Sequence, residues 1–119
     1  MNDLSIVISS CDKYHYIWDI QLQFFNLYWP NCPYQIYYVS ETSQIPDIKT
    51  NLKLNNYNTN KPSSGPSDWS FALIELLEKL TSDYIIYSQE DYVFVDRVKD
   101  KDLQDLLEYS KTNNVNYVR

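Results

Sequence analysis

The stretch that decides the fold is residues 83–92, DYIIYSQEDY, an apolar run that leads into two acids. Its Ile and Tyr side chains predict a central strand covered on both faces, because buried parallel strands carry continuous apolar runs. Ligands of open α/β sheets bind just beyond the carboxyl ends of such strands. Glu90 and Asp91 therefore stand where carboxylates could hold a divalent cation. The competing interpretation is a polar loop with two solvated acids, since most charged residues are exposed.

Composition limits the classes of function. The chain has 119 residues, enough for one domain with a real core, and its formal net charge of −6 argues against nucleic acid or an anionic membrane as the main partner. Gly65 is its single glycine, where average usage predicts roughly eight. This scarcity excludes a phosphate-binding P-loop and a G-x-G-x-x-G dinucleotide turn.

The two cysteines, Cys11 and Cys32, have no C-x-x-C spacing, so neither a zinc site nor a redox motif is predicted. A reduced protein of the cytoplasm, on its own or peripheral to the membrane, is the expectation. We expect no signal peptide and no transmembrane segment, because no apolar run is long enough to cross a bilayer.

Apolar periodicity predicts alternating strands and helices. Strands are expected at 4–10, 34–40, 83–88, 92–95 and 115–119, and helices at 14–28, from Ser67 to about 80, and from Asp100 or Asp102 to about 112. The first helix should turn Ile17, Ile20, Phe24 and Leu27 inward, with Trp18, Leu22 and Phe25 widening this stripe. Residues 41–66 form a long polar loop in which a short strand near 48–54 could lie.

This order of elements predicts a single α/β domain over residues 1–119, with a mainly parallel sheet and helices on both faces. Because the last predicted strand has only begun when the sequence ends, we expect a truncated architecture.

Acids follow two of the predicted parallel strands: Asp12 after the first, and Glu90 with Asp91 after the third. If those strands are neighbours, the acids converge on one crevice, and such an oxygen-rich cluster suits Mg²⁺ or Mn²⁺. Asp12 has a competing role as a helix N-cap, which we favour. His15 is interpreted as a surface or helix-start residue. Trp69 belongs to the core or stacks on a base.

Several of these motifs, in this order, resemble a known family. They are residues 28–34 (YWPNCPY), the strand at Ile36 and Tyr37, Trp69-Ser70 at a helix start, and Glu90-Asp91-Tyr92. Together they resemble bacterial glycosyltransferases of the GT-A fold that act in surface-polysaccharide synthesis. The resemblance extends from the first strand to Tyr117.

The resemblance implies a Rossmann-like, nucleotide-sugar-binding N-terminal half. In such enzymes the first strand-turn, here Ser9, Ser10, Cys11 and Asp12, lies against the nucleotide, with Trp69 as a further donor contact. The Glu90-Asp91 pair takes the place of the family's D-x-D element. By similarity, Asp91 faces a Mn²⁺ or Mg²⁺ ion and Glu90 lies toward the ribose or supports Asp91.

In the same family the second half of the enzyme supplies the acceptor site and any catalytic base. The chain ends before it, so we expect donor binding here and glycan transfer in the full-length form. Two alternatives remain open. One is a non-catalytic α/β remnant. The other is a phospho-acceptor signalling domain, which would need a second acid after the first strand and a lysine at the end of a fifth.

Overall fold

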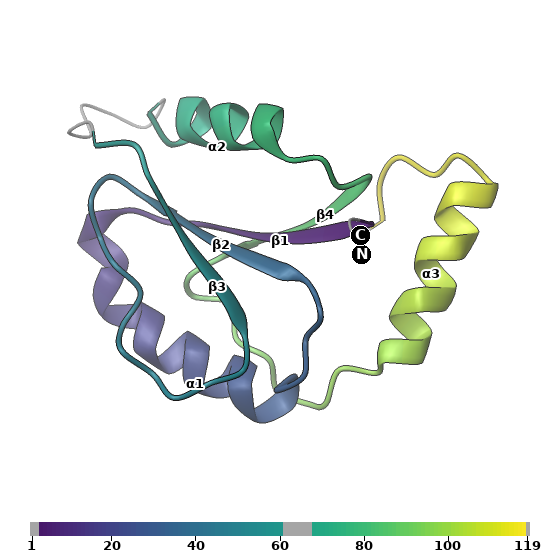
Figure 1. Ribbon diagram of the computed structural model, residues 1–119, viewed down its shortest axis with the longest axis horizontal. Helices are drawn as coiled ribbons and strands as arrows, with labels where there is room; N and C mark the ends of the chain where they lie inside the picture. Colours follow the sequence, from purple (N-terminus) through teal and green to yellow (C-terminus); the bar gives the residue numbers. More distant parts are fainter. Residues whose placement is uncertain (1–2, 61–67, 119) are drawn as a thin grey trace.

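Four parallel strands form one sheet in the order β3-β2-β1-β4 (Figure 1). The strands are β1 (Leu4–Ser9), β2 (Gln35–Ser40), β3 (Lys53–Asn58) and β4 (Tyr84–Gln89). The computed structural model describes residues 3–60 and 68–118. This strand order is that of one half of a Rossmann-like sheet, and it confirms the predicted α/β class.

Helices cover both faces of the sheet, as predicted. Figure 1 shows α1 (Trp18–Tyr28) and α2 (Asp68–Lys79) on opposite sides, with α3 (Asp100–Thr112) at the end of the molecule near both termini. A short 3₁₀ helix, η1 (Asp12–Ile17), leads into α1. The core on the α1 side is the larger of the two, and the side chains of Ile6, Ile8, Trp18, Leu22 and Phe25 lie at its centre.

The α2 side has a smaller core. Val7 and Val39 of the sheet pack there with Ala72 and Leu76 of α2. Successive residues along a strand therefore serve opposite layers, as Ile6, Val7 and Ile8 of β1 do, which is the alternation expected of a pleated strand.

β1 and β2 are the inner strands and β4 lies at the edge of the sheet, so the prediction of a central, doubly covered strand at 83–88 is wrong. All six residues of β1 are buried. In the described part of the chain β4 pairs with β1 alone, which leaves Ile85 36% and Tyr87 41% exposed on the α2 side. An apolar run identifies a strand, but its position in the sheet depends on pairing between residues far apart in the sequence.

The inward face of α1 matches only part of the predicted stripe, since Trp18, Leu22 and Phe25 are buried as expected. Ile20 and Leu27 are 53% and 63% exposed, and Phe24 is exposed too, whereas Leu22 and Phe25 are fully buried. Residues 17, 20, 24 and 27 and residues 18, 22 and 25 both have helical spacing, so the spacing alone does not tell which of the two stripes faces the sheet.

Three other segments depart from prediction. A strand does form within 41–66, but it is β3 at Lys53–Asn58 and not 48–54. Residues 92–95 and 115–118 form no strand. Phe94 instead turns into the core against Phe25, and the Val115 amide donates to the Ser110 carbonyl at the end of α3. The predicted helix start at Ser67 and the end of the polar loop lie outside the described residues.

Candidate functional site at the carboxyl edge of β1 and β4

The segments that leave β1 and β4 meet at the carboxyl edge of the sheet. From β1 the chain moves outward through β2 to β3, and it then returns to the other side of β1 to form β4. The order of the strands therefore reverses between β1 and β4. Open α/β sheets bind ligands at such a switch point, outside the carboxyl ends of the strands. Ser9 is paired with Gln89 across it, so Ser10 to Asp12 and Glu90 with Asp91 begin side by side.

Ser10 of the first segment lies close to Glu90 of the second. Its side chain is one of the groups that lower the pKa of the Glu90 carboxyl. The Trp18 indole Nε1–H of α1 donates to Ser10 Oγ at 2.9 Å, and the Ser10 hydroxyl itself lies 3.5 Å from the Cys11 carbonyl oxygen. Ser10 thus links α1 to the exit of β1 beside the buried acid.

Glu90 is a buried acid at the centre of this arrangement, with 8% of its surface exposed. Burial raises the pKa of its carboxyl, and the negative charge of the adjacent Asp91 raises it further. Hydrogen bonds from its own backbone and from Ser10 oppose these effects in part. The site thus holds a carboxyl group whose raised pKa favours its neutral form. Residues whose pKa is shifted by burial and by a neighbouring charge are common at functional sites.

Asp91 follows directly and is exposed. In the parts of the chain that are described, no cluster of three or more His, Cys, Asp or Glu side chains could hold a metal ion. Magnesium in phosphate-binding sites is commonly held by one or two carboxylates together with phosphate oxygens and water. An exposed carboxylate such as Asp91 could serve in that mode of binding, and the Mg²⁺ or Mn²⁺ expected at Asp91 and Glu90 stays a prediction.

Asp12 is not an N-cap, and the prediction that favoured this role is wrong. Cys11 is the N-cap residue of η1, and no side chain caps this helix. The Asp12 carboxylate instead reaches the loop after β2. It accepts hydrogen bonds from the Thr42 hydroxyl at 2.6 Å and from the Ser43 hydroxyl at 2.6 Å. The amides of Thr42 and Ser43 donate to it at 3.0 and 2.9 Å.

These four donors lower the pKa of Asp12 from 3.8 to about 2 against the opposing effect of desolvation. The Asp12 amide in turn donates to Glu41 Oε2 at 3.1 Å. Asp12 therefore joins the exits of β1 and β2, and its carboxylate oxygens are already engaged.

Ser9 and Cys11 complete the β1 exit. Ser9 is buried, and Cys11 is a half-buried free thiol. Desolvation raises the pKa of Cys11, and the nearby Glu41 and Glu90 carboxylates add to the effect. The thiol is therefore neutral at physiological pH and is a poor nucleophile.

One residue of the site, Gln21, was not singled out from the sequence. Its side chain is buried in α1, where Nε2 donates to the carbonyl oxygens of Gln89 at 2.8 Å and Tyr92 at 2.9 Å. The Tyr38 hydroxyl donates to its Oε1 at 2.7 Å. Gln21 thus fixes both ends of the acidic turn. The one feature of the sequence that could have identified Gln21 is its uncharged amide side chain between Ile20 and Leu22 in an apolar helix.

His15 and Trp69 were also considered from the sequence, and they lie on η1 and α2. His15 is half-buried, with its ring edge on Trp18 and Nε2 2.7 Å from the Gln44 carbonyl, so it supports the β2 exit loop. Trp69 belongs to α2, but its side chain lies outside the described residues, and its predicted contact with the donor stays a prediction.

Comparisons with protein-family models, curated proteins and solved structures find no match to this chain. Among residues 3–60 and 68–118, none of the helices has the length and apolar character needed to cross a bilayer.

Proposed function

We propose that the chain is the nucleotide-diphospho-sugar-binding part of a glycosyltransferase, with the donor at the carboxyl edge between β1 and β4. The complete enzyme would transfer the sugar to a glycan acceptor in surface-polysaccharide synthesis. The free Cys11 and Cys32 accord with a cytoplasmic location, on its own or at the membrane surface.

The observation that carries the proposal is the meeting of two predicted donor segments at a switch point. The sequence placed Ser9 to Asp12 and Glu90 with Asp91 after different strands. The parallel pairing of β1 with β4 brings them together, and Ser10 lies close enough to Glu90 to lower the pKa of its carboxyl. A nucleotide bound in this crevice would have the β1 exit on one side and the acidic turn on the other.

The charge of the crevice determines how a diphosphate could bind there. Glu41, Glu90 and Asp91 are all acidic, so an uncompensated diphosphate would be repelled. A divalent cation held by Asp91 would supply the positive charge that offsets the phosphates. Glu90 is buried beside Ser10, and it is better suited to position the turn or meet a ribose hydroxyl than to be the main metal ligand.

The order of strands disfavours the signalling alternative. The doubly wound order typical of phospho-acceptor domains places the third strand next to the first. Here β3 lies beyond β2, and β4 takes the place beside β1. The carboxylate of Asp12, which such a domain would need for a metal, is fully engaged by Thr42 and Ser43.

A thermal-shift experiment tests the proposal against the remnant alternative. UDP-glucose and GDP-mannose are each added with Mn²⁺ or Mg²⁺. At a hundredfold excess over its dissociation constant, a bound donor stabilises the fold by about 2.7 kcal/mol, or several degrees in Tm.

Asp91→Asn should abolish the metal-dependent part of the shift. The matched control is Asp96→Asn, an exposed acid five residues further on, which should leave the shift unchanged. The remnant alternative is correct if no donor raises Tm with either metal.

A further inference from the structure

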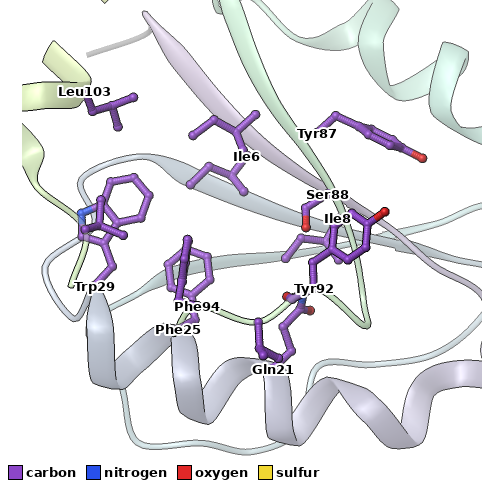
Figure 2. A pocket seen from close by; sticks show the side chains of 13 residues that line it. Ile6, Ile8, Gln21, Phe25, Trp29, Tyr87, Ser88, Tyr92, Phe94 and Leu103 are labelled. Carbon is purple, nitrogen blue, oxygen red and sulfur yellow. The ribbon is translucent and has the colours of Figure 1, made fainter. Parts of the chain in front are cut away.

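A concave feature lies on the α1 side of the sheet, next to the turn that follows β4. It is a cleft of about 270 Å³ between α1, the sheet and the segment that follows β4 (Figure 2). Ile6 and Ile8 of β1 and Ile86 and Ser88 of β4 form its floor. The rest of the lining is Gln21, Phe25, Trp29, Tyr87, Tyr92, Val93, Phe94, Val98 and Leu103.

Aromatic rings close one end of the cleft. The Phe94 ring stands edge-on to Phe25 at a centroid distance of 5.0 Å and to Trp29 at 6.1 Å. Figure 2 shows these three rings gathered beneath Ile6, while the Tyr87 ring points away from the other labelled side chains. A ligand at this end would meet ring edges and aliphatic carbons.

The lining contains no charged side chain, and most of its polar groups are already paired. Both amide hydrogens of Gln21 are donated to backbone carbonyls, and the Trp29 indole N–H donates to Asp100 at 2.7 Å. Ser88 differs. Its hydroxyl makes a long 3.3 Å bond to the Gln89 carbonyl, so its oxygen can still accept, and the hydroxyl can turn to another partner.

This chemistry selects the class of ligand. A charged or phosphorylated molecule would lose its hydration without gaining a partner, which is costly. Water is also poorly suited, because an ordered buried water needs two or more polar partners. An apolar cavity of about 150 Å³ is enough to hold benzene, so a cleft of this size can hold one or two rings.

We propose that this cleft is a binding site for an uncharged aromatic or alicyclic small molecule that carries a single hydroxyl or similar polar group. Its rings lie among Phe25, Trp29 and Phe94, and its polar group meets the Ser88 hydroxyl. The site does not depend on the nucleotide-sugar proposal, because none of its contacts uses Glu90 or Asp91.

The test uses 4-fluorophenol as probe, followed by ¹⁹F NMR titration, with fluorobenzene as the matched probe that lacks the hydroxyl. Saturable binding of 4-fluorophenol is expected. Ser88→Ala should weaken its binding about fivefold, the worth of one hydrogen bond, and should leave fluorobenzene unaffected.

Two substitutions fill the cleft from different walls. Ser88→Phe fills it from the floor, and Val98→Phe fills it from the segment after β4; each should abolish binding of both probes. Ile85→Phe is the matched control, because it adds the same ring to the same strand on the opposite face. Unchanged binding in a folded Ser88→Phe or Val98→Phe protein would overturn the proposal, as would the lack of saturable binding to the wild type.

Amide chemical-shift mapping of the wild-type protein keeps the test decisive if neither filled variant folds. Shifts concentrated at residues 6–8, 21–29 and 86–94 support the cleft. Shifts centred on α2 or on the exposed face of α1 overturn it.

Discussion

At the scale of single residues, Asp12 was predicted to lie against the nucleotide, and its carboxylate instead holds the loop after β2 through hydrogen bonds. Its four donors from Thr42 and Ser43 hold its pKa at about 2, below the ordinary 3.8. A lowered folded-state pKa means that the ionised group stabilises the fold above pH 3.8 and that this contribution is lost as the pH falls toward 2. The carboxylate has some contact with solvent, so we place the contribution at about 1 kcal/mol.

Asp12→Asn should therefore lower the free energy of unfolding by about 1 kcal/mol at neutral pH, because the amide cannot accept all four bonds. Urea unfolding at a series of pH values measures it. The difference from wild type should shrink as the pH approaches 2, and Asp47→Asn, at an exposed acid, should show little difference at any pH. A difference that is independent of pH would contradict this account of Asp12.

Glu90 should behave in the opposite way. Because burial raises its pKa, its charge costs stability at neutral pH, and the fold gains stability as the pH falls through the folded-state pKa. Glu90→Gln keeps an acceptor for Ser10 and removes the charge. We expect the free energy of unfolding to rise by about 0.5–1 kcal/mol, the reverse of the usual effect of substituting a buried residue.

Chemical denaturation at neutral pH checks this expectation, with Glu78→Gln on the exposed side of α2 as the control. A loss of stability in Glu90→Gln would show that the ionised carboxylate contributes favourable bonds that exceed its burial cost.

At the scale of elements, Gln21 couples α1 to the exit of β4. Replacement by the similarly shaped Met would leave the Gln89 and Tyr92 carbonyls and the Tyr38 hydroxyl without their partner. Each unsatisfied buried group costs about 1–3 kcal/mol, so Gln21→Met should destabilise the fold by at least about 2 kcal/mol. Hydrogen exchange should also accelerate at the Tyr92 amide, which closes the acidic turn on Gln89.

Gln23→Met is the matched control for this change, because Gln23 is an exposed residue of the same helix whose amide bonds to Asp19. It should change the stability by less than about 0.5 kcal/mol. Equal effects of the two substitutions would show that the hydrogen bonds from Gln21 to the acidic turn contribute no more stability than those of an exposed glutamine.

The face that α1 turns inward makes a second prediction at this scale. Leu22→Ala should cost about 2–4 kcal/mol, since Leu22 is fully buried. Ile20→Ala should cost less than about 0.5 kcal/mol, because more than half of Ile20 is exposed. Thermal or urea unfolding of the two variants measures the contrast, and a larger loss for Ile20→Ala would show that the Ile20 face of α1 is the one that packs on the sheet.

The helices and strands that were predicted correctly are those with strong local patterns. The β1, β2 and β4 strands and the α1 and α3 helices follow from runs such as 4–9 and 100–112, where propensity and apolar spacing agree. β3 was misplaced because its sequence, KLNNYN, is polar and gains its stability from pairing with β2. The exposed stripe of α1 was misjudged because this helix has two apolar stripes of the same spacing, and the choice between them depends on packing against the sheet.

At the scale of the whole molecule, the topology decides what the acidic residues can do. The sequence identified both halves of the candidate site, Ser9 to Asp12 and Glu90 with Asp91, because each follows a recognisable strand. Their contact depends on β4 returning to pair with β1, and the engagement of Asp12 depends on the loop after β2. Neither relation is encoded in a local pattern, which is why Gln21 and the true role of Asp12 required the structure.

The measurement that tests the central claim most directly is paramagnetic broadening of backbone amides by Mn²⁺ in the presence of UDP-glucose, with Mg²⁺ as the diamagnetic reference. If the switch point between β1 and β4 binds the donor and its metal, broadening should centre on residues 9–12 and 89–92. It should require the nucleotide sugar and be lost in Asp91→Asn. Broadening centred elsewhere on the molecule, or the same broadening in Asp91→Asn, would contradict the claim.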